Sequence, residues 1–381
     1  MTPFEHVSRT RLVFGPGTLS RLGEIARELG FRRTLVVSDP GVVAAGYTAR
    51  ARAALESAGI VVATFSDFDH DPTSAMADAG AALARAQGVD SLVGLGGGSS
   101  LDCAKSIGFL LANVGRIPDY RGYAKVKQPL PPMIGIPTTA GTGSEAQSYA
   151  LVSDDVTHEK MACGDTTAAF RVAILDPELL LSLPRAVTAV TGYDAIAHSV
   201  ETWVTSARTP VSDLYAREAF RLLDSHYERV LAEAKDLDAR GAMLLGAHWA
   251  GAAIEASMLG ATHACANPLT ARYGTAHGVA IALLLPHVVR WNGAVAGARY
   301  AELLAATGRH VSDAEAAAAL AARLEALAMA GELPRGLKTI GVPEADLPAL
   351  AAEAAQQWTG RYNPRPFDAK AAQELYRDAY A

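Results

Sequence analysis

One aspartate and three histidines have side chains that could together bind a divalent metal ion. Asp194 and His198 are four residues apart in a segment of helical character, so their side chains would lie on one face of a helix. His263 and His277 follow in stretches of small and apolar residues, where a charged or unpaired imidazole is costly. One carboxylate and three imidazoles suit a divalent first-row metal. Each histidine taken alone is more often a core or capping residue, so the hypothesis depends on all four residues together.

A glycine-rich turn could bind phosphate. Residues 94–99 read Gly-Leu-Gly-Gly-Gly-Ser, between a short apolar run and a helical pattern. Glycine lets phosphate oxygens approach the backbone amides, and the start of the following helix adds a partial positive charge. The turn matches neither the GxGxxG fingerprint of dinucleotide-binding folds nor a Walker loop. A tight structural turn is the alternative.

A second loop, at 137–144, is rich in glycine, threonine and serine and also follows an apolar run. Its hydroxyls and amides suit a polar ligand, and ligands of open α/β sheets bind at the carboxyl ends of the strands. For this segment alone, an ordinary surface loop is an equal alternative. Two such loops at one end of one sheet favour a nucleotide.

Asp39 ends the first apolar run of the alternating region and precedes Pro40-Gly41. A carboxylate at a strand end can accept hydrogen bonds from a ribose 2′-hydroxyl and would repel a 2′-phosphate. Taken alone, an ordinary turn aspartate is the simpler interpretation.

The elements that must position these residues differ between the two halves of the chain. In the first half, apolar runs at 34–38, 61–65, 91–95 and 133–137 alternate with helical patterns. This alternation predicts an α/β domain with a mostly parallel sheet that is covered on both faces. After about residue 184 the sequence is almost entirely Ala- and Leu-rich and helical. We therefore predict an α/β domain at 1–183 and an all-α domain at 184–381.

Composition excludes several classes of protein. The chain has 381 residues, of which 50% are hydrophobic and 19% charged, so it can bury a large core and is not a disordered chain. A net charge of -6 without Lys/Arg clusters argues against nucleic acid or an anionic membrane as partner. Neither a signal peptide nor a transmembrane span is apparent. Three cysteines are too few for a disulfide framework, and we predict a cytoplasmic protein with reduced thiols.

Several motifs, in order, resemble those of the iron-containing (group III) alcohol dehydrogenase family. They are GGGSSLDCAK, PTTAGTGSE, LDPELLLSLP followed by TGYDAIAHSVE, and the pair His263 and His277-Gly278, with Asn363-Pro364-Arg365 near the C-terminus. The resemblance runs from about residue 10 to residue 285. It implies a dinucleotide-binding α/β domain, a helical domain, and a metal site in the interdomain cleft.

The resemblance also assigns the site residues. It implies Fe(II), with Zn(II) as the alternative, held by Asp194, His198, His263 and His277. It implies NAD as the cofactor, bound by Asp39, Gly97, Gly98, Ser99, Asp102, Thr138, Thr139 and Lys160. One position departs from the family pattern: many members have a histidine near the substrate where this chain has Asn267. Asparagine can form hydrogen bonds but cannot titrate, so a proton relay through this position is in doubt.

The predicted reaction is reversible hydride transfer between a primary alcohol or aldehyde and NAD(H). The metal would act as a Lewis acid that lowers the pKa of the alcohol. A homodimer or larger homo-oligomer is expected. The alternatives are a zinc-dependent polyol oxidoreductase similar to glycerol dehydrogenase, a lyase similar to dehydroquinate synthase, and a non-catalytic NAD-binding sensor. No role is assigned to Glu255, which lies in an otherwise apolar helical segment.

Overall fold

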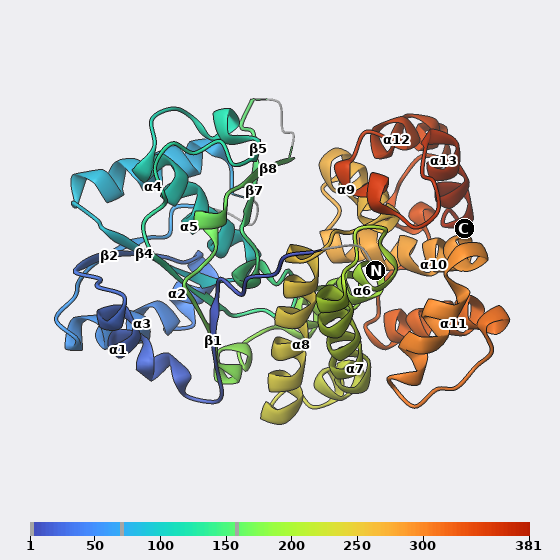
Figure 1. Ribbon diagram of the computed structural model, residues 1–381, viewed down its shortest axis with the longest axis horizontal. Helices are drawn as coiled ribbons and strands as arrows, with labels where there is room; N and C mark the ends of the chain where they lie inside the picture. The colour runs from blue at the N-terminus through green and yellow to red at the C-terminus, as the bar shows by residue number, and fades with distance from the viewer. Residues whose placement is uncertain (1–3, 69–71, 157–159) are drawn as a thin grey trace. The chain divides into compact units, whose positions relative to one another are not determined.

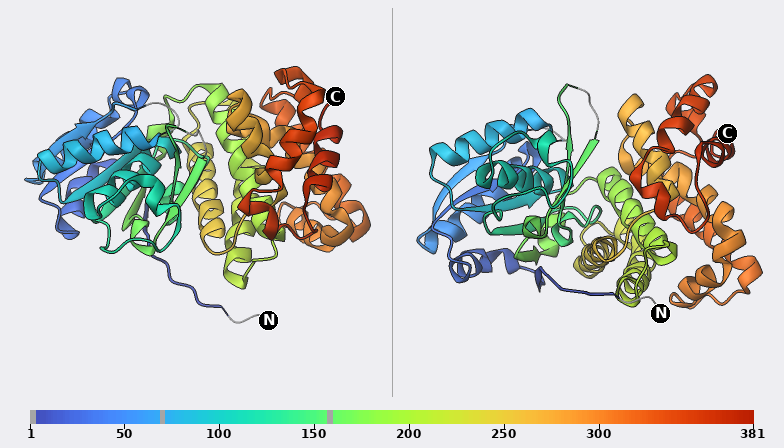
Figure 2. Two further views of the ribbon diagram at one scale, coloured as in Figure 1. Left: turned by 90° about the horizontal axis from the view of Figure 1, so that it is seen from above. Right: turned by 45° about the horizontal axis from the view of Figure 1, so that its top comes forward.

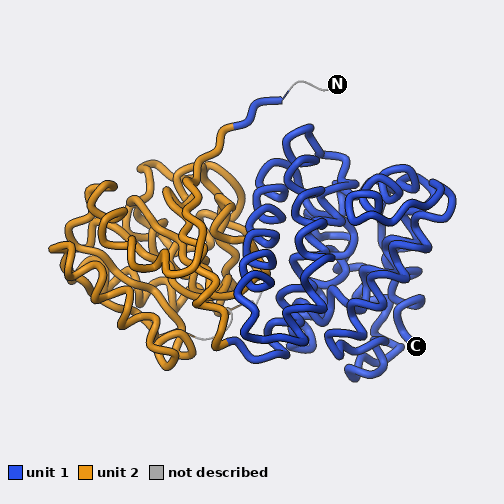
Figure 3. Tube along the Cα trace, turned by 90° about the horizontal axis from the view of Figure 1, so that it is seen from below, with its two compact units in different colours: residues 1–6, 183–381 blue, residues 7–182 orange. Residues whose placement is uncertain are grey.

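The computed structural model describes residues 4–68, 72–156 and 160–381. The chain divides into two compact units, which Figure 3 colours separately. The α/β unit comprises residues 7–182, and the helical unit comprises residues 183–381 together with residues 1–6. Within the helical unit, the ring of His6 lies 5.9 Å from that of Tyr215.

A parallel six-stranded sheet forms the centre of the α/β unit. Its strand order is β1-β9-β6-β4-β2-β3, and every paired strand runs parallel. The strands are β1 (Arg11–Phe14), β2 (Arg33–Val37), β3 (Val61–Phe65), β4 (Ser91–Gly96), β6 (Met133–Pro137) and β9 (Val172–Leu175). The four predicted strands are confirmed as β2, β3, β4 and β6. The central strand β4 is buried along its whole length, as expected of a parallel strand covered on both faces.

Helices cover both faces of this sheet (Figure 1). Helices α1 (Leu22–Glu28) and α3 (Tyr47–Ser57) lie on one side, and α4 (Ser74–Ala86) and α5 (Gly98–Ala112) on the other. Gly80 allows α4 and α5 to approach closely, because a Cβ there would lie 2.3 Å from Ile107 Cδ1. The unit is completed by α2 (Pro40–Ala44) and by a small second sheet with the order β5-β8-β7, formed by β5 (Gly122–Tyr123), β7 (Tyr149–Ser153) and β8 (Lys160–Gly164).

The helical unit contains no strand between residues 183 and 381, all of which the structure describes. Figure 2 shows its helices packed side by side. They are α6 (Arg185–Val204), α7 (Pro210–Ala232), α8 (Leu237–Glu255), α9 (Ala261–Tyr273), α10 (His277–Ala305), α11 (Asp313–Ala330), α12 (Leu347–Ala354) and α13 (Ala369–Asp378). By length and composition α10 could cross a membrane, but 67% of its apolar window is buried inside the structure, as in a core helix.

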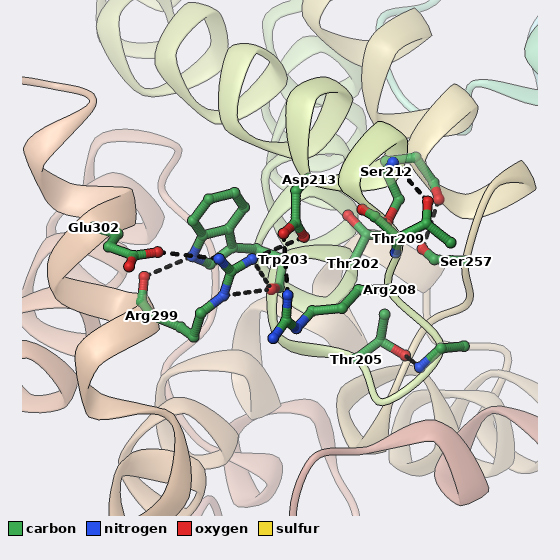
Figure 4. A network of polar contacts seen from close by, with 12 residues as sticks. Thr202, Trp203, Thr205, Arg208, Thr209, Ser212, Asp213, Ser257, Arg299 and Glu302 are labelled. Atoms are coloured by element: carbon green, nitrogen blue, oxygen red, sulfur yellow. Dashed lines mark hydrogen bonds and ion pairs between the residues drawn. The ribbon is translucent and has the colours of Figure 1, made fainter. Parts of the chain in front are cut away.

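Helix α6 lies in the core of this unit, and each residue from 192 to 204 is buried. A helix that is buried all round must find partners for any polar side chain that it carries. At its C-terminal end, the guanidinium of Arg299 from α10 stacks 3.5 Å from the ring centre of Trp203 (Figure 4). The same guanidinium donates to the Trp203 carbonyl oxygen at 2.8 Å and to Asp213 Oδ1 of α7 at 2.8 Å. This network fixes the end of α6 to α7 and α10.

Candidate metal centre and cofactor loops

Three histidine nitrogens converge on one carboxylate oxygen in the helical unit. Asp194 Oδ1 lies 3.4 Å from His198 Nε2, 3.5 Å from His263 Nε2 and 3.8 Å from His277 Nε2. Asp194 and His198 come from successive turns of α6, His263 from the first turn of α9, and His277 from the first residue of α10. The side chain of His277 is 31% exposed and the other three are buried, which leaves the cluster open on one side.

The cluster fits a cation. Among the residues that the structure describes, neither Asp194 Oδ1 nor His263 Nε2 has a hydrogen-bond partner, although both atoms are buried. Buried polar atoms without partners are rare in folded proteins and usually mark an ion, a water or a functional site. Three imidazole nitrogens and one carboxylate oxygen are a donor set that suits iron or zinc. Asp194, His263 and His277 place one ligand atom each within 4.8 Å of one another, a group that could hold a metal ion, and the fourth predicted ligand, His198, lies 3.4 Å from Asp194 Oδ1.

Asp194 supplies a negative charge for such an ion. Burial alone would raise the pKa of Asp194, but the imidazoles of His198, His263 and His277 lower it well below its usual range. Burial lowers the pKa of His263, but the carboxylates of Glu201 and Asp194 raise it to about 9. The carboxylate of Asp194 is therefore ionised at neutral pH.

Glu201 is a member of this site that the sequence interpretation missed. It lies on α6 one turn beyond His198, and its Oε2 accepts a hydrogen bond from His263 Nδ1. Its Oε1 accepts a hydrogen bond of 2.7 Å from the Thr262 backbone N–H. Asp194, His198 and Glu201 follow each other at intervals of four and three residues, the spacing of one helix face, and this spacing could have revealed Glu201.

In the α/β unit, the two predicted cofactor loops lie against each other. The loops follow the neighbouring strands β4 and β6, and the Thr138 N–H donates to the Gly96 carbonyl oxygen at 2.9 Å. A Cβ on Gly98 would lie 2.6 Å from Thr142 Cγ2, so only glycine fits there without a shift. A Cβ on Gly97 would lie 3.4 Å from Thr139 Cγ2. The loops thus offer close backbone approach at the carboxyl ends of two adjacent parallel strands.

Asp39 lies next to these loops. It caps α2 by accepting a hydrogen bond of 3.1 Å from Val42 N, and its other oxygen accepts one of 2.9 Å from Ser100 Oγ. Gly96 is required here, because its φ is +152° and a Cβ would lie 2.8 Å from Asp39 Oδ2. Asp39 therefore caps α2 and also lies beside the glycine-rich turn.

The remaining predicted cofactor residues lie on α5, on the second loop and, for Lys160, at the start of β8. Ser99 and Thr139 are half-buried, and Thr138 is buried. Asp102 Oδ1 accepts a hydrogen bond of 2.6 Å from Ser144 Oγ. Burial raises the pKa of Asp102, and the charges of Lys105 and Lys160 counteract this only in part.

Lys105 is a second residue that the sequence interpretation missed. It is fully buried on α5, and its Nζ donates to the carbonyl oxygens of Ser144 at 2.8 Å and Tyr149 at 2.6 Å. It also lies 3.8 Å from Asp102 Oδ1. Lys105 therefore fastens the second loop to the helix that follows the first. Its position three residues after Asp102 in the GGGSSLDCAK motif was the available signal.

Asn267 lies on α9 one turn after His263 and is half-buried. Its Nδ2 donates a hydrogen bond of 3.0 Å to Gln357 Oε1.

Glu255 is the last residue of α8 and is half-buried. Cys265, between the two ligand candidates of α9 and α10, is fully buried, and burial raises the pKa of its thiol, as in an inert core residue.

Comparisons with known proteins identify the class. The family model "Iron-containing alcohol dehydrogenase" matches residues 9–177, and the model of the C-terminal domain of the Fe-containing alcohol dehydrogenase family matches residues 188–380. The chain therefore belongs to the iron-containing alcohol dehydrogenase family.

Individual relatives match over nearly the whole chain. An NAD-dependent methanol dehydrogenase of Bacillus methanolicus is 34% identical over 93% of this chain and 93% of its own length. A 1,3-propanediol dehydrogenase of Klebsiella pneumoniae is 34% identical over 96% of each chain. A solved structure of a 1,3-propanediol oxidoreductase matches with a TM-score of 0.97 and 32% identity, over 100% of both chains.

These matches confirm the predicted family and the predicted order of an α/β domain followed by a helical one. They also confirm the reaction class, a metal-dependent oxidoreductase of alcohols and aldehydes that uses NAD(H) and iron.

Proposed function

We propose that Asp194, His198, His263 and His277 hold one Fe(II) ion, and that the chain interconverts small primary alcohols and aldehydes with NAD(H). The observation that carries the proposal is the convergence of three Nε2 atoms on Asp194 Oδ1 within 3.4–3.8 Å, with that oxygen buried. A bound ion supplies Lewis acidity toward the substrate oxygen, and the nicotinamide gives or accepts the hydride.

The protein's own groups prepare this chemistry. Asp194 offsets part of the cation's charge, because its pKa is held low and it remains ionised. The buried side chains of α6 around it keep bulk water from three of the four ligands. The partly exposed ring of His277 marks the side from which a substrate would approach. Electrostatic interactions are stronger where water is excluded.

We propose that NAD(H) lies on the two loops of the α/β unit, with its phosphates on the amides that follow β4. The residues assigned to it are Asp39, Gly97, Gly98, Ser99, Asp102, Thr138, Thr139 and Lys160. The Asp39 carboxylate would accept hydrogen bonds from the ribose hydroxyls and repel the 2′-phosphate of NADP(H). The hydrogen bond from Ser100 Oγ supports this by fixing the carboxylate beside the turn.

The names of the relatives support a small, polar substrate. Three of them are named for methanol, 1,3-propanediol and lactaldehyde, which are all small and polar. We propose residues 1–183 as the dinucleotide-binding domain and 184–381 as the metal-binding domain, acting in a cytoplasmic homodimer or larger homo-oligomer. The three buried, free cysteines accord with a reducing compartment.

The experiment is metal removal and replacement. The purified protein is stripped with a chelator, reloaded anaerobically with Fe(II) or Zn(II), and assayed for NADH oxidation with a panel of small aldehydes. Activity should be lost on stripping and return with one Fe(II) per chain. Full activity in the stripped protein would contradict a metal-dependent reaction. Restoration by Zn(II) alone would favour the zinc-dependent polyol oxidoreductase.

A further inference from the structure

We infer that Glu201 is a positioning residue for the metal site: it fixes His263 in the tautomer whose Nε2 can bind the ion. This inference rests on the proposed metal site and extends it to a residue that is not itself a ligand. Glu201 is 4% exposed, within the segment of α6 that is buried all round. A carboxylate in such a place is costly unless both oxygens have partners.

Both partners of Glu201 lie at the start of α9. This helix begins after Gly260, which has no side chain with which to cap the free backbone N–H groups of the first turn. Glu201 Oε1 instead accepts the Thr262 N–H from another helix at 2.7 Å, and Asn363 Oδ1 accepts the Ala261 N–H at 3.3 Å. A negative charge at a helix N-terminus is favourable. Glu201 thus holds the helix turn that carries His263.

The second oxygen of Glu201 sets the proton position on His263. Oε2 contacts Nδ1, and a carboxylate can only accept a hydrogen bond, so Nδ1 must carry the hydrogen. In a neutral imidazole the lone pair is then on Nε2, the atom that lies 3.5 Å from Asp194 Oδ1. Metal-bound histidines commonly donate their other N–H to a carboxylate in this way, and such partners are typically worth about 10–100-fold in metal affinity.

Gly260 provides the space for this arrangement. A Cβ at this position would lie 3.1 Å from Glu201 Oε1 and 3.0 Å from Asn363 Oδ1. Any residue other than glycine at this position would therefore place its Cβ in tight contact with the oxygens of Glu201 and Asn363. The same carboxylate caps the helix and orients the ring, so α6 supplies two ligand candidates and the support of a third.

The test compares Glu201→Gln with the wild type. Glutamine keeps the size of the side chain but has only one acceptor oxygen. When that oxygen accepts the Thr262 N–H, the side-chain NH₂ faces His263 Nδ1. The NH₂ can only donate, so it favours the tautomer of His263 with the hydrogen on Nε2. We expect the dissociation constant for Zn(II), measured by chelator competition, to rise about 10–100-fold. The Co(II)-loaded variant should also show a changed ligand-field absorption spectrum.

The matched control is Asp224→Asn, a buried carboxylate of the same unit that pairs with Arg309 and Arg323. It should lower the free energy of unfolding without weakening Zn(II) binding. If both variants weaken Zn(II) binding equally, or if Glu201→Gln binds as the wild type does, the positioning role is wrong. If the wild type itself binds no Zn(II) at this cluster, the proposed metal site fails instead.

A second measurement needs no variant. A long-range ¹H–¹⁵N spectrum of the histidine rings in the Zn(II)-loaded wild type reports which ring nitrogen carries hydrogen. We expect His263 to be protonated at Nδ1 and ligated through Nε2. Ligation through Nδ1 would overturn the inference, even if Glu201→Gln fails to fold.

Discussion

The geometry of the candidate metal site and that of the predicted cofactor loops depend on opposite features. The cluster consists of titratable side chains from three helices, and its geometry is given by the atoms that converge on Asp194 Oδ1. The loops consist of backbone and small side chains, and they pack closely because Gly96 and Gly98 have no Cβ atom. Removal of one ligand side chain should therefore abolish metal binding. In the loops, cofactor binding should be weakened most by substitutions that add a side chain at a glycine.

The largest expected effect is in the cluster. His263→Ala removes one ligand and should lower metal content below stoichiometry and kcat/KM by about a thousandfold, because Lewis-acid activation contributes several kcal/mol. His226→Ala is the control, since His226 is half-buried on α7 and its ring contacts the Leu222 carbonyl oxygen instead. Elemental analysis measures the metal. One full equivalent in His263→Ala would remove His263 from the ligand set.

The next effect is in the loops. Gly98→Ala places a methyl group 2.6 Å from Thr142 Cγ2 and should raise the dissociation constant for NADH by about 10–100-fold, as expected of overpacking, without loss of metal. Thr142→Ala in the same chain should restore part of the affinity. Fluorescence titration of both single variants and the double variant gives the coupling. Independent effects of the two substitutions would contradict the steric account.

A smaller effect concerns the choice of cofactor. Asp39→Asn keeps a side chain that can cap α2 but removes the charge that would face a 2′-phosphate. We expect the preference for NADH over NADPH, as a ratio of kcat/KM values, to fall about tenfold. A wild-type enzyme that prefers NADPH would show that Asp39 does not contact the ribose.

The smallest effect is at Asn267, where a side-chain change should alter neither metal nor cofactor binding. Asn267→His breaks the hydrogen bond with Gln357 and introduces an ionisable group one turn from His263. If that group passes the alcohol proton to solvent, the pH profile of kcat should gain an ionisation near 6.5. Superimposable profiles with altered KM values between alcohols would show that this position only shapes the substrate site.

The sequence predicted four of the six strands of the parallel sheet, and it missed β9, although the four residues of β9, VAIL, are apolar and buried and precede Asp176-Pro177. β2, β3, β4 and β6 are apolar runs bounded by turn residues, and each was predicted. β1 was also not predicted, because its apolar run is only three residues long, Leu12–Phe14, and only one of its four residues is buried. The small sheet of β5, β7 and β8 was also missed, since its strands depend on pairing with each other rather than on composition.

In the candidate site, too, local features could be predicted from the sequence, whereas features that depend on the packing of helices could not. The helical spacing of Asp194 and His198 was visible in the sequence, and so were the glycines of the first loop. The approach of His263 and His277 to Asp194 depends on how α9 and α10 pack against α6, which spacing alone does not specify. Glu201 and Lys105 each end a motif that the sequence shows, but their partners, His263 and the second loop, lie on other elements, so the motifs alone did not indicate their function.

The most direct test of the central claim is anomalous X-ray diffraction at the iron edge from crystals loaded anaerobically with Fe(II). We expect one strong peak per chain, bonded to a carboxylate oxygen of Asp194 and to Nε2 of His198, His263 and His277, with Nδ1 of His263 still in contact with Glu201. An iron peak elsewhere in the chain, or an ion at this cluster that lacks one of the four residues, would contradict the account.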